Sequence, residues 1–478
     1  MKLNEILKSL PITEIIGTDN PEITSVTNDS RECTQGTLFV AVRGFQTDGH
    51  KYIKKAVENG ASAVVCEEST PGLCVPQIIV KNSRRSEAEV SSAFYGHPSK
   101  KFRLIGITGT NGKTTVTYLV KHILEQCGYK VGLIGTNQNM IGDRVTETGR
   151  TTPHSIELQA IFADMADENV DFCVMEVSSH ALELDRVYGC HYAVGAFTNL
   201  TQDHLDFHKT MQNYANAKYK LMEISDVAVI NADDAFGKEM IEKCSLKCLS
   251  YSTQNKDASL FADNISLLSD GVSFKLCAAP FYLGIPGEFS VYNALCAIGI
   301  AKALKIDDEK ISASLKTAIG VKGRAEVVPT LTDYTVIIDY AHTPDGIENI
   351  LSAVKGFAKG RVVIVFGCGG DRDNTKRPIM GEIAGKMADF CVVTSDNPRT
   401  EEPLKIIAMV EEGVKKTDCP YVVIENRREA IKYALDNARE GDCIVLAGKG
   451  HETYQILNSG TIHFDEREVV REILAERK

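Results

Sequence analysis

The sequence predicts a three-domain α/β protein whose cores are built on parallel sheets. Short apolar runs alternate with amphipathic stretches of helical periodicity, and continuous apolar runs are typical of parallel strands buried on both faces. With 478 residues, the chain is too long for a single core. Turn-rich segments at residues 96–99 and 320–324 interrupt the pattern, so we expect domains over residues 1–99, 100–324 and 325–478.

Composition and charge exclude several classes of protein. The net charge of −11 argues against a nucleic-acid scaffold, and no stretch approaches the roughly twenty apolar residues that a membrane-spanning helix needs. The N-terminal sequence MKLNEILKSLP is a short amphipathic helical pattern with charges throughout, unlike a signal peptide. The 14 cysteines are scattered without a C-x-x-C pair, which is typical of reduced core residues. We therefore expect a cytoplasmic protein.

The first domain is expected to alternate strands and helices. Strand-like runs cover residues 37–42, 62–66 and 76–80, and helical stretches cover residues 50–59 and 83–95. Two polar, turn-rich segments flank the first strand, at residues 27–31 and 44–49. On the residues alone, ordinary loop chemistry accounts for both segments.

The second domain is expected to be a parallel sheet with the rhythm of β-α-β units. Its strand-like runs are residues 104–108, 130–136, 172–177, 193–198 and 226–231. Ligands bind at the carboxyl ends of strands in such sheets, and polar residues gather at those places here. They include Glu176, Ser178, Asn199, Asp203, His204, His208, Asn231, Asp233 and Asp234. Later in the domain, alternating runs after Tyr251 predict antiparallel additions, and residues 289–304 predict a buried helix with Asn293 as its odd polar member.

A phosphate-binding loop stands at the centre of this domain, in the segment IGITGTNGKTT at residues 105–115. An apolar run enters it, and helix-like sequence over residues 114–126 leaves it. Gly109 and Gly112 let backbone N–H groups close around phosphate oxygens, while the helix N-terminus adds partial positive charge. Lys113 is placed to contact the outer phosphates.

The loop departs from the general pattern G-x-x-x-x-G-K-[ST], because Ile107 stands where the first glycine would be. The shorter pattern G-x-x-G-K-T-T remains, with two glycines to form the turn. The flanking strand and helix make an incidental lysine in a turn a poor explanation. The sequence therefore predicts nucleotide binding.

Magnesium bound to a nucleotide needs hard oxygen ligands. The hydroxyl of Thr114 or Thr115 and the carboxylate of Glu176 are the natural candidates, since each follows a strand of one sheet. His204 is a third candidate, although a histidine in a loop is more often structural.

The third domain is expected to be a second open, Rossmann-like α/β unit. Its strand-like runs are residues 335–340, 361–367, 390–396, 421–425 and 443–448. The loops that follow them are dense in charge, at residues 339–345, 367–377, 396–399 and 448–452. Arginine suits carboxylates, and Glu and Asp suit an ammonium group, so these loops predict a zwitterionic substrate. On the residues alone, Arg399 could instead simply pair with Glu401 or Glu402.

Six motifs together resemble the Mur ligase family of ATP-dependent amide-bond ligases, almost from end to end. They are GTNGKTT at Gly109, EVSSHAL at Glu176, TNLTQDHLDFH at Thr198, NADD at Asn231, GRAE at Gly323 and DYAHTPDG at Asp339. The motifs GCGGDRDNTKRP, DNPR and GKGHE resemble in particular the branch of the family that adds meso-diaminopimelate. Several long motifs in a fixed order make this resemblance more specific than the phosphate loop alone.

The resemblance implies a UDP-binding first domain, an ATP-binding second domain and an amino-acid-binding third domain. It also implies contacts with UDP-N-acetylmuramoyl-L-alanyl-D-glutamate. In the first domain these contacts fall on Asn28, Ser30, Phe45, Gln46 and Thr47. In the second domain they fall on Arg150, Thr151, Thr152, Ser178 and Arg186. Relatives often carry Asn in place of Arg150 and Gln in place of Leu184.

The resemblance implies further sets of residues for ATP, catalysis, metal and the amino acid. The ATP contacts are Gly109, Thr110, Asn111, Gly112, Lys113, Thr114, Thr115, Asn293, Arg324, Asp339 and His342. The catalytic residues are Lys113, Glu176, His204 and Lys218, and the metal ligands are Thr115, Glu176, His204 and Lys218. The amino-acid pocket is Arg372, Asp396, Asn397, Pro398, Arg399, Gly448 and Glu452. Lys218 matches an N-carboxylated lysine (a carbamate); without the resemblance it would be interpreted as a plain surface lysine.

The implied reaction joins meso-diaminopimelate to the D-glutamate γ-carboxylate through an acyl phosphate, in peptidoglycan synthesis. Mg²⁺ is the implied cofactor, and ATP is a substrate. The implied partners are therefore three small molecules, and we expect a monomer with no nucleic-acid partner.

Several alternatives remain open. The acceptor could be L-lysine, or the chain could be similar to folylpolyglutamate synthase, which shares the phosphate loop. The DNPR and GKGHE loops argue against the second alternative. A nucleotide-dependent switch would leave the charged C-terminal loops unexplained, and a non-enzymatic UDP-sugar binder would leave Lys113 and Glu176 unexplained.

Overall fold

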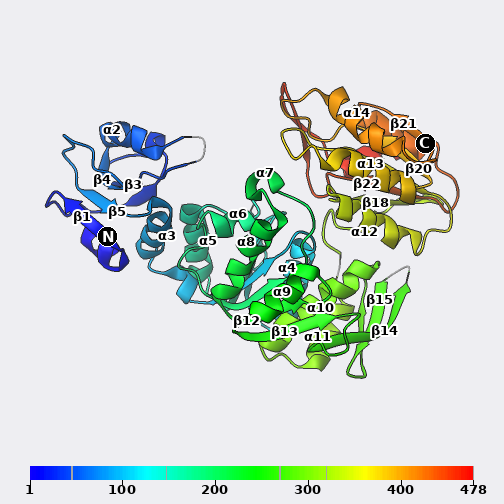
Figure 1. Cartoon of the computed structure of the whole chain (residues 1–478), viewed down its shortest axis with the longest axis horizontal. Coiled ribbons are helices and arrows are strands. Elements are labelled where there is room, and N and C mark those ends of the chain that lie inside the picture. The colour runs from blue at the N-terminus through cyan, green and yellow to red at the C-terminus, as the bar shows by residue number, and fades with distance from the viewer. Residues whose placement is uncertain (45–46, 147, 269–270, 319, 477–478) are drawn as a thin grey trace. The chain divides into compact units, whose positions relative to one another are not determined.

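The computed structural model describes residues 1–44, 47–146, 148–268, 271–318 and 320–476, and they form the mixture of helices and strands that the sequence predicts (Figure 1). The chain divides into two compact units. The first contains residues 1–108, 128–196 and 217–227, and the second contains residues 109–127, 197–216 and 228–478. The chain crosses between them inside the expected second domain, and the division into three domains stays a prediction.

The N-terminal part of the first unit is a five-stranded sheet in the order β1-β5-β4-β3-β2. These strands are β1 (Ile12–Ile16), β2 (Ser25–Thr27), β3 (Thr37–Val40), β4 (Ala61–Cys66) and β5 (Gln77–Val80). Only β1 runs antiparallel to its neighbour. The sequence analysis predicts β3, β4 and β5 but misses β1 and β2, which are short and carry polar residues.

Helices cover both faces of this sheet. Apolar side chains of α1 (Leu3–Ile6) and α3 (Ser83–Phe94) pack on one face, and those of α2 (Ile53–Glu58) pack on the other. Short 3-10 turns complete the region, at η1 (Leu7–Ser9), η2 (Ser30–Glu32), η3 (Gly49–Tyr52) and η4 (Pro98–Lys100). Alternate residues of β3 and β4 therefore enter two different cores.

The rest of the first unit contains strands in the order β11-β6-β10-β7-β8-β9. They are β6 (Arg103–Thr108), β7 (Val131–Ile134), β8 (Asn139–Ile141), β9 (Arg144–Thr146), β10 (Phe172–Glu176) and β11 (Tyr192–Phe197). The helices of this part are α5 (Ser155–Asp167) and α6 (Ser179–Glu183). β10 pairs in parallel with both β6 and β7, and all residues of β10 are buried, as expected for a strand covered on both faces.

The second unit begins with the phosphate loop and contains strands in the order β16-β15-β14-β13-β12. They are β12 (Ser225–Asn231, shared with the first unit), β13 (Lys247–Ser252), β14 (Leu260–Leu268), β15 (Gly271–Leu276) and β16 (Ala279–Leu283). β14, β15 and β16 pair antiparallel, which confirms the predicted antiparallel additions. The helices are α4 (Lys113–Gln126), α7 (Leu205–His208), α8 (Met211–Glu223, shared with the first unit), α9 (Ala235–Lys243), α10 (Glu288–Ala303) and α11 (Asp308–Lys316). The buried helix α10 packs against α4 and β13.

The C-terminal part of the second unit is a six-stranded sheet in the order β17-β18-β22-β19-β20-β21. Its strands are β17 (Glu326–Val328), β18 (Thr335–Asp339), β19 (Val362–Phe366), β20 (Phe390–Val393), β21 (Tyr421–Val423) and β22 (Cys443–Ala447). All but β17 run parallel, as predicted. A hairpin of β23 (Tyr454–Leu457) and β24 (Gly460–His463) follows, and the sequence analysis does not predict it.

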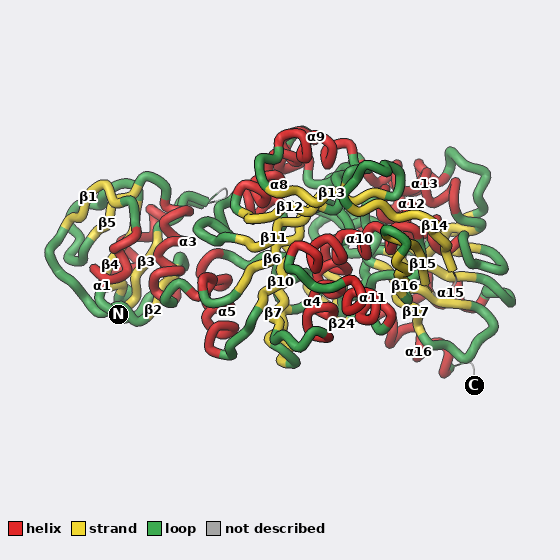
Figure 2. Tube along the Cα trace, turned by 90° about the horizontal axis from the view of Figure 1, so that it is seen from below, coloured by secondary structure: helices red, strands yellow, loops and turns green. Residues whose placement is uncertain are grey.

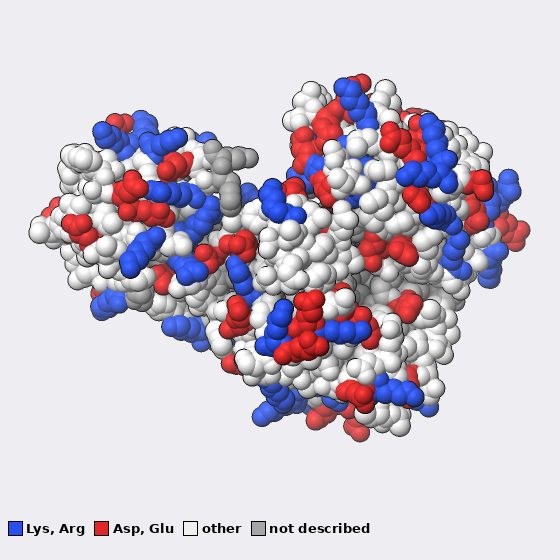
Figure 3. Space-filling view, viewed as in Figure 1, with Lys and Arg blue, Asp and Glu red and all other residues white. Residues whose placement is uncertain are grey.

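Helices again cover both faces of this sheet. α12 (Pro344–Lys355), α13 (Lys376–Met387) and α14 (Pro403–Val414) share one core, and α15 (Arg427–Asp436) and α16 (Glu466–Ala475) share the other. Figure 2 shows α12 and α13 apart from α15 and α16 in this part of the chain. Most cysteines are buried thiols, and none forms a disulfide. Acidic and basic side chains are mixed over the face drawn in Figure 3. In the described residues, no helix combines the length and apolar character that a membrane span requires.

Candidate functional site

The phosphate loop between β6 and α4 depends on its two glycines. Gly109 has a φ of 149° and Gly112 a φ of 83°, a region that side chains with a Cβ rarely adopt. A Cβ added to Gly109 would lie 1.8 Å from the Oγ1 of Thr198, and one added to Gly112 would lie 2.5 Å from the Oδ1 of Asn293. Both positions therefore require glycine because of conformation and because of space.

A second strand-end turn holds the loop in place. The side-chain oxygen of Asn199 accepts a hydrogen bond from the backbone N–H of Asn111 at 2.9 Å, and the hydroxyl of Thr198 donates to the carbonyl of Asn111 at 2.6 Å. The ammonium of Lys113 lies 3.0 Å from the carbonyl oxygen of Gly109 and 2.8 Å from that of Thr110. The side chain of Lys113, the predicted phosphate contact, is therefore hydrogen-bonded to the backbone of the loop.

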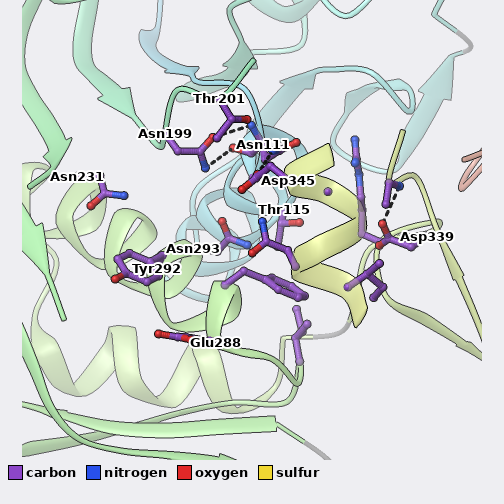
Figure 4. A pocket seen from close by; sticks show the side chains of 18 of the residues that line it. Asn111, Thr115, Asn199, Thr201, Asn231, Glu288, Tyr292, Asn293, Asp339 and Asp345 are labelled. Atoms are coloured by element: carbon purple, nitrogen blue, oxygen red, sulfur yellow. Dashed lines mark hydrogen bonds between the residues drawn. The ribbon is translucent and has the colours of Figure 1, made fainter. Parts of the chain in front are cut away.

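A cleft of about 430 Å³ opens beside the loop, within the usual range for a small-molecule site (Figure 4). Side chains of the loop, of the ends of β11 and β12, of α10, of the segments around β17 and β18, and of α12 line it. They include Asn111, Thr115, Asn199, Thr201, Asn231, Glu288, Tyr292, Asn293, Arg324, Asp339, Tyr340 and Asp345. The structure therefore brings together most of the residues that the resemblance assigns to ATP.

Arg324 supplies a cation to this cleft. Its Nη2 donates to the hydroxyl of Thr114 at 3.1 Å, and its guanidinium lies 4.8 Å from the centre of the Tyr340 ring. Its buried Nε has no hydrogen-bond partner in the described residues. An unpartnered arginine N–H beside a phosphate loop fits a polyphosphate ligand.

Of two further candidates for ATP contacts, Asp339 lines the cleft and His342 does not. The carboxylate of Asp339 accepts hydrogen bonds from the backbone N–H groups of Ala325 and Ala341, and burial raises its pKa. His342 lies outside the cleft lining, with its Nδ1 2.8 Å from the carbonyl oxygen of Tyr340. Burial lowers the pKa of His342 to about 4, so this histidine is neutral at physiological pH.

Asp345 is a cleft residue that the sequence analysis does not assign. Its carboxylate accepts a hydrogen bond from the side-chain amide of Asn111, which joins the N-terminal turn of α12 to the phosphate loop (Figure 4). Burial raises the pKa of Asp345. Asp345 belongs to the DYAHTPDG motif, and this membership could have identified it from the sequence.

A second polar site lies in the first unit, where β7 and β10 end. The hydroxyl of Thr152 donates to the carbonyl of Glu176 at 2.9 Å and accepts from the N–H of Ser178 at 3.0 Å. The guanidinium of Arg186 donates to the carbonyl of Thr152 at 3.0 Å, and Thr151 is 3.0 Å from Thr136 between hydroxyl oxygens. Four of the five residues assigned to the peptide-bearing substrate in this domain therefore come together.

The surroundings of Arg186 are strongly cationic. Burial, then the charges of Arg150 and Arg84, lowers the pKa of Arg186 to about 10. Burial, then the charges of Arg186, Arg150 and Arg84, lowers the pKa of His154 to about 4. The buried Nε of Arg186 has no partner in the described chain. This concentration of positive charge suits an anionic ligand, and the sequence analysis misses Arg84 and His154 because neither stands in a motif.

The first-domain candidates are only partly described. The amide of Asn28 donates to the buried carboxylate of Glu87 at 2.6 Å, and the carbonyl of Ser30 accepts from Asn59 at 2.8 Å. The hydroxyl of Thr47 is 3.3 Å from that of Tyr52. Phe45 and Gln46 lie outside the described residues.

The charged C-terminal loops bring the acceptor candidates together around β20 and β22. Asp396, Asn397, Pro398 and Glu452 are buried, while Arg372 is exposed and donates to the carbonyl of Asp371. Gly448 has a φ of 118°, and a Cβ there would lie 2.3 Å from the Oδ2 of Asp396. The side chains of Asn397 and Glu452 are hydrogen-bonded at 2.8 Å.

Arg399 does not pair with its acidic neighbours in the sequence. Glu401 binds Arg377 at 2.8 Å and Glu402 binds Lys405 at 3.1 Å. Arg399 instead donates to the carbonyl of Gly370 at 2.8 Å, and within the described residues it has no carboxylate partner. The interpretation of Arg399 as a simple surface ion pair is therefore wrong.

The four metal candidates are divided between the units, with Glu176 and Lys218 in the first and Thr115 and His204 in the second. The carboxylate of Glu176 is buried and accepts hydrogen bonds from the N–H and hydroxyl of Thr136, at 2.8 and 3.0 Å. Lys218 on α8 is only 1% exposed, so its interpretation as a plain surface lysine is wrong. Over the described ranges, no three His, Cys, Asp or Glu side chains converge as a metal site.

Comparison with known proteins gives matches along almost the whole chain. Residues 22–95 match the catalytic domain of the Mur ligase family, residues 107–301 match the Mur ligase middle domain, and residues 323–450 match the Mur ligase glutamate ligase domain.

Individual proteins match from end to end. The chain is 52% identical over 484 residues to the UDP-N-acetylmuramoyl-L-alanyl-D-glutamate–2,6-diaminopimelate ligase of Caldanaerobacter subterraneus subsp. tengcongensis, covering 100% of this chain and 99% of that protein. It is 50% identical to the ligase of the same name from Clostridium botulinum, with both chains covered completely. A solved structure of a ligase of this name superposes with a TM-score of 0.70 at 32% identity, covering 100% of this chain and 99% of the other.

Replacing Gly109 with alanine should abolish nucleotide binding, because the new Cβ would collide with Thr198 and the φ of 149° would be strained. Calorimetric titration with ATP measures the effect. The matched control is Gly128→Ala at the other end of α4, where φ is 89° but no atom lies within 4 Å of the new Cβ. That control should lose about 1 kcal/mol of stability and keep its affinity for ATP. Unchanged ATP affinity in Gly109→Ala would contradict the assignment of the loop.

Proposed function

The chain belongs to the Mur ligase family, and we propose on that basis that it is the ATP-dependent ligase that adds meso-diaminopimelate to UDP-N-acetylmuramoyl-L-alanyl-D-glutamate in peptidoglycan synthesis. The observation that carries the proposal is the 52% identity, over the whole chain, to a ligase named for this reaction. The cleft beside the phosphate loop and the charged loops at the ends of β20 and β22 support it.

ATP is proposed to bind in the 430 Å³ cleft, with its phosphates on the loop from Gly109 to Thr115. The backbone N–H groups of the loop, the ammonium of Lys113 and the guanidinium of Arg324 would neutralise phosphate charge. Asn293, Asp339 and His342 would complete the pocket.

The proposed reaction has two steps. The γ-carboxylate of the D-glutamate attacks the γ-phosphorus of ATP, so that an acyl phosphate forms and ADP leaves. The amine of the acceptor then attacks the acyl carbon, the amide bond forms, and phosphate leaves with loss of a proton from the amine. Positioning and electrostatic stabilisation by the chain supply most of the catalysis in such a transfer.

Magnesium fits the residues assigned to it by the chemistry of their donor atoms. The hydroxyl of Thr115 and the carboxylate of Glu176 offer hard oxygens, and a carbamate on Lys218 would offer two more. Bound Mg²⁺ would neutralise charge on the transferring phosphoryl group. His204, which is 43% exposed and lies 3.5 Å from Asp203, is proposed as a further contact of the metal.

The dipeptide end of the UDP substrate is proposed to bind Thr151, Thr152, Ser178 and Arg186, with Arg150 at the edge of the same cationic site. The hydroxyls and the unpartnered Nε of Arg186 suit carboxylate oxygens. Asn28, Ser30, Phe45, Gln46 and Thr47 are proposed to contact the UDP end. We also propose a three-domain organisation with boundaries near residues 99 and 324, a monomer, and a cytoplasmic location.

The acceptor is proposed to bind between Arg372, the turn from Asp396 to Arg399, Gly448 and Glu452. meso-Diaminopimelate differs from lysine by one carboxylate at the far end of its side chain. Arg399 has no carboxylate partner in the described residues and is free of Glu401 and Glu402, so it can offer its planar donor pair to that carboxylate. The buried carboxylate of Glu452 would receive the distal ammonium.

Phosphate release from ATP should require both the UDP-dipeptide and meso-diaminopimelate, because the acyl phosphate needs the first and its breakdown to amide needs the second. A coupled phosphate assay, with the product identified by mass, measures this requirement. Lys113→Ala should reduce the rate to less than about one hundredth, since the loop loses its cation, while the melting temperature without ligand stays the same. Release of phosphate with ATP alone at the full rate would instead indicate a nucleotide switch.

Lys218 should carry a carbamate, because it matches the N-carboxylated lysine of the family and its side chain is buried. The carbamate forms when a neutral lysine amine attacks CO₂ and loses a proton. Carbon NMR after equilibration with ¹³C-bicarbonate should show one protein-bound carbamate that is absent from Lys218→Ala. Lys220→Ala is the matched control, since Lys220 lies on the same helix but is exposed and paired with Glu183 at 2.7 Å. A carbamate signal that survives in Lys218→Ala would place the modification elsewhere.

Arg399→Ala should reduce kcat/KM for meso-diaminopimelate by a factor on the order of 10² or more, because losing a desolvated arginine–carboxylate pair costs roughly 2–5 kcal/mol. The KM for ATP should hardly change. Steady-state kinetics with meso-diaminopimelate and with L-lysine measure the selectivity, and Arg428→Ala, which removes an exposed arginine paired with Glu472, is the control. Equal losses with both acceptors, or a wild-type preference for lysine, would show that Arg399 does not select the substrate.

A further inference from the structure

Lys449 is a buried cation of the GKGHE loop, and the proposed reaction assigns it no role. It lies in the turn after β22, between Gly448 and Gly450, and it is 0% exposed. A buried ammonium is costly unless charged or polar partners surround it. Here its Nζ lies 3.0 Å from the Oδ1 of Asn397 and 3.0 Å from the Oε2 of Glu452.

These contacts fix the orientation of Asn397. Its Oδ1 also accepts a hydrogen bond from the backbone N–H of Ile456 at 3.0 Å, and its Nδ2 donates to the Oε2 of Glu452 at 2.8 Å. With the amide turned over, two donors would face Lys449 and Ile456, and the carbonyl would face a carboxylate. Lys449, Asn397 and Glu452 therefore form a triangle of mutual hydrogen bonds, in which the amide of Asn397 has one favourable orientation.

Asp396, Glu452 and Lys449 form a cluster whose net charge is negative. Burial raises the pKa of Glu452, the negative charge of Asp396 raises it further, and Lys449 lowers it. Arg427 also faces this region, but it is paired with the buried Glu466 at 2.8 Å. The further titratable or charged neighbours are Tyr340, Tyr454, His451, Arg324 and Arg399. Asp396, Glu452 and Lys449 together carry one negative charge, which matches one ammonium of an incoming amino acid, while the charge of Arg399 remains for its carboxylate.

We propose that Lys449 is a positioning residue of the acceptor site, which holds Glu452 and Asn397 in the orientation and charge state that receive the side-chain ammonium of the acceptor. The proposal rests on the proposed function and extends it to a residue that would not itself touch the substrate. Without Lys449, the adjacent carboxyl groups of Asp396 and Glu452 would repel each other, and Glu452 would take up a proton near neutral pH. A neutral acid cannot form the ion pair that the acceptor needs.

A purely structural role for Lys449 makes a different prediction. If the triangle only stabilises the turn, the loss of Lys449 should lower the melting temperature. It should then change the KM values of all substrates equally at every pH. If Lys449 sets the charge of Glu452, the loss should be selective for the acceptor and should depend on pH.

The test is Lys449→Met, which keeps the aliphatic chain and removes the charge. The KM for meso-diaminopimelate should rise about tenfold or more near neutral pH, while the KM for ATP and kcat stay within about twofold. The pKa of Glu452 would be raised in the variant, so its carboxyl group should lose its proton only at a higher pH. The difference in KM for meso-diaminopimelate between the variant and the wild type should therefore become smaller by about pH 8.5. Lys432→Met, which removes an exposed lysine paired with Asp436 at 2.9 Å, should match the wild type.

A readout that needs no turnover separates this proposal from the proposed function. Carbon NMR titration of the Glu452 carboxyl, assigned with Glu452→Gln, should show a higher pKa in Lys449→Met than in the wild type. Failure of the wild type to ligate any amino acid would contradict the proposed function, whereas an unchanged pKa of Glu452 would overturn the role of Lys449 alone. An equal rise in KM for ATP and acceptor would also overturn it. If Lys449→Met does not fold, the double variant Lys449→Met/Glu452→Gln removes both charges and replaces it in the test. If the KM of this double variant for meso-diaminopimelate depends on pH in the same way as that of the wild type, the proposal is contradicted.

Discussion

The burial of the parallel strands on both faces is the constraint on which the rest of this structure depends. Every residue of β10, β19 and β22 is buried, so polar side chains cannot gather along these strands. They gather where the strands end, since backbone N–H groups and helix N-termini are free to bind ligands there. The phosphate loop, Glu176, Asp339 and Asp396 all occupy such positions, and the chemistry of the protein follows from that placement.

Close backbone approaches then lock the strand-end loops to one another. In the second unit, Gly448 donates its N–H to the carbonyl of Asp339 at 3.0 Å, and a Cβ on Gly323 would lie 2.1 Å from the backbone nitrogen of His451. The rings of Tyr340 and His451 are 4.9 Å apart. The segment around Asp339 and Tyr340, which lines the cleft, therefore packs directly against the loop that carries Glu452, so the proposed nucleotide and acceptor sites share this contact.

The distribution of ion pairs separates structural cations from those available to ligands. Arg427 binds Glu466, Arg377 binds Glu401, and Lys449 binds Glu452, so each of these buried cations is paired with a carboxylate of the chain. Arg186, Arg324 and Arg399 form no ion pair with a carboxylate in the described part of the chain. Each of these three arginines lies in a different proposed subsite, and each proposed ligand group there is an anion: the dipeptide carboxylates, the phosphates and the distal carboxylate of the acceptor.

The sequence by itself determined the α/β class, most of the parallel strands, the phosphate loop and the family, because these features depend on local patterns of apolar residues and glycines or on ordered motifs. It missed β1, β2 and the β23–β24 hairpin, whose strands of three to five residues are too short for a clear alternating pattern. Only the tertiary structure decided that Lys218 is buried, that Glu401 belongs to Arg377, and that Lys449 holds Asn397 and Glu452. Asn397 and Lys449 are 52 residues apart, and Asn111 and Asp345 are 234 apart. The energy of a charge or a hydrogen bond depends on distance and burial, and packing alone sets both for residues so far apart in the chain.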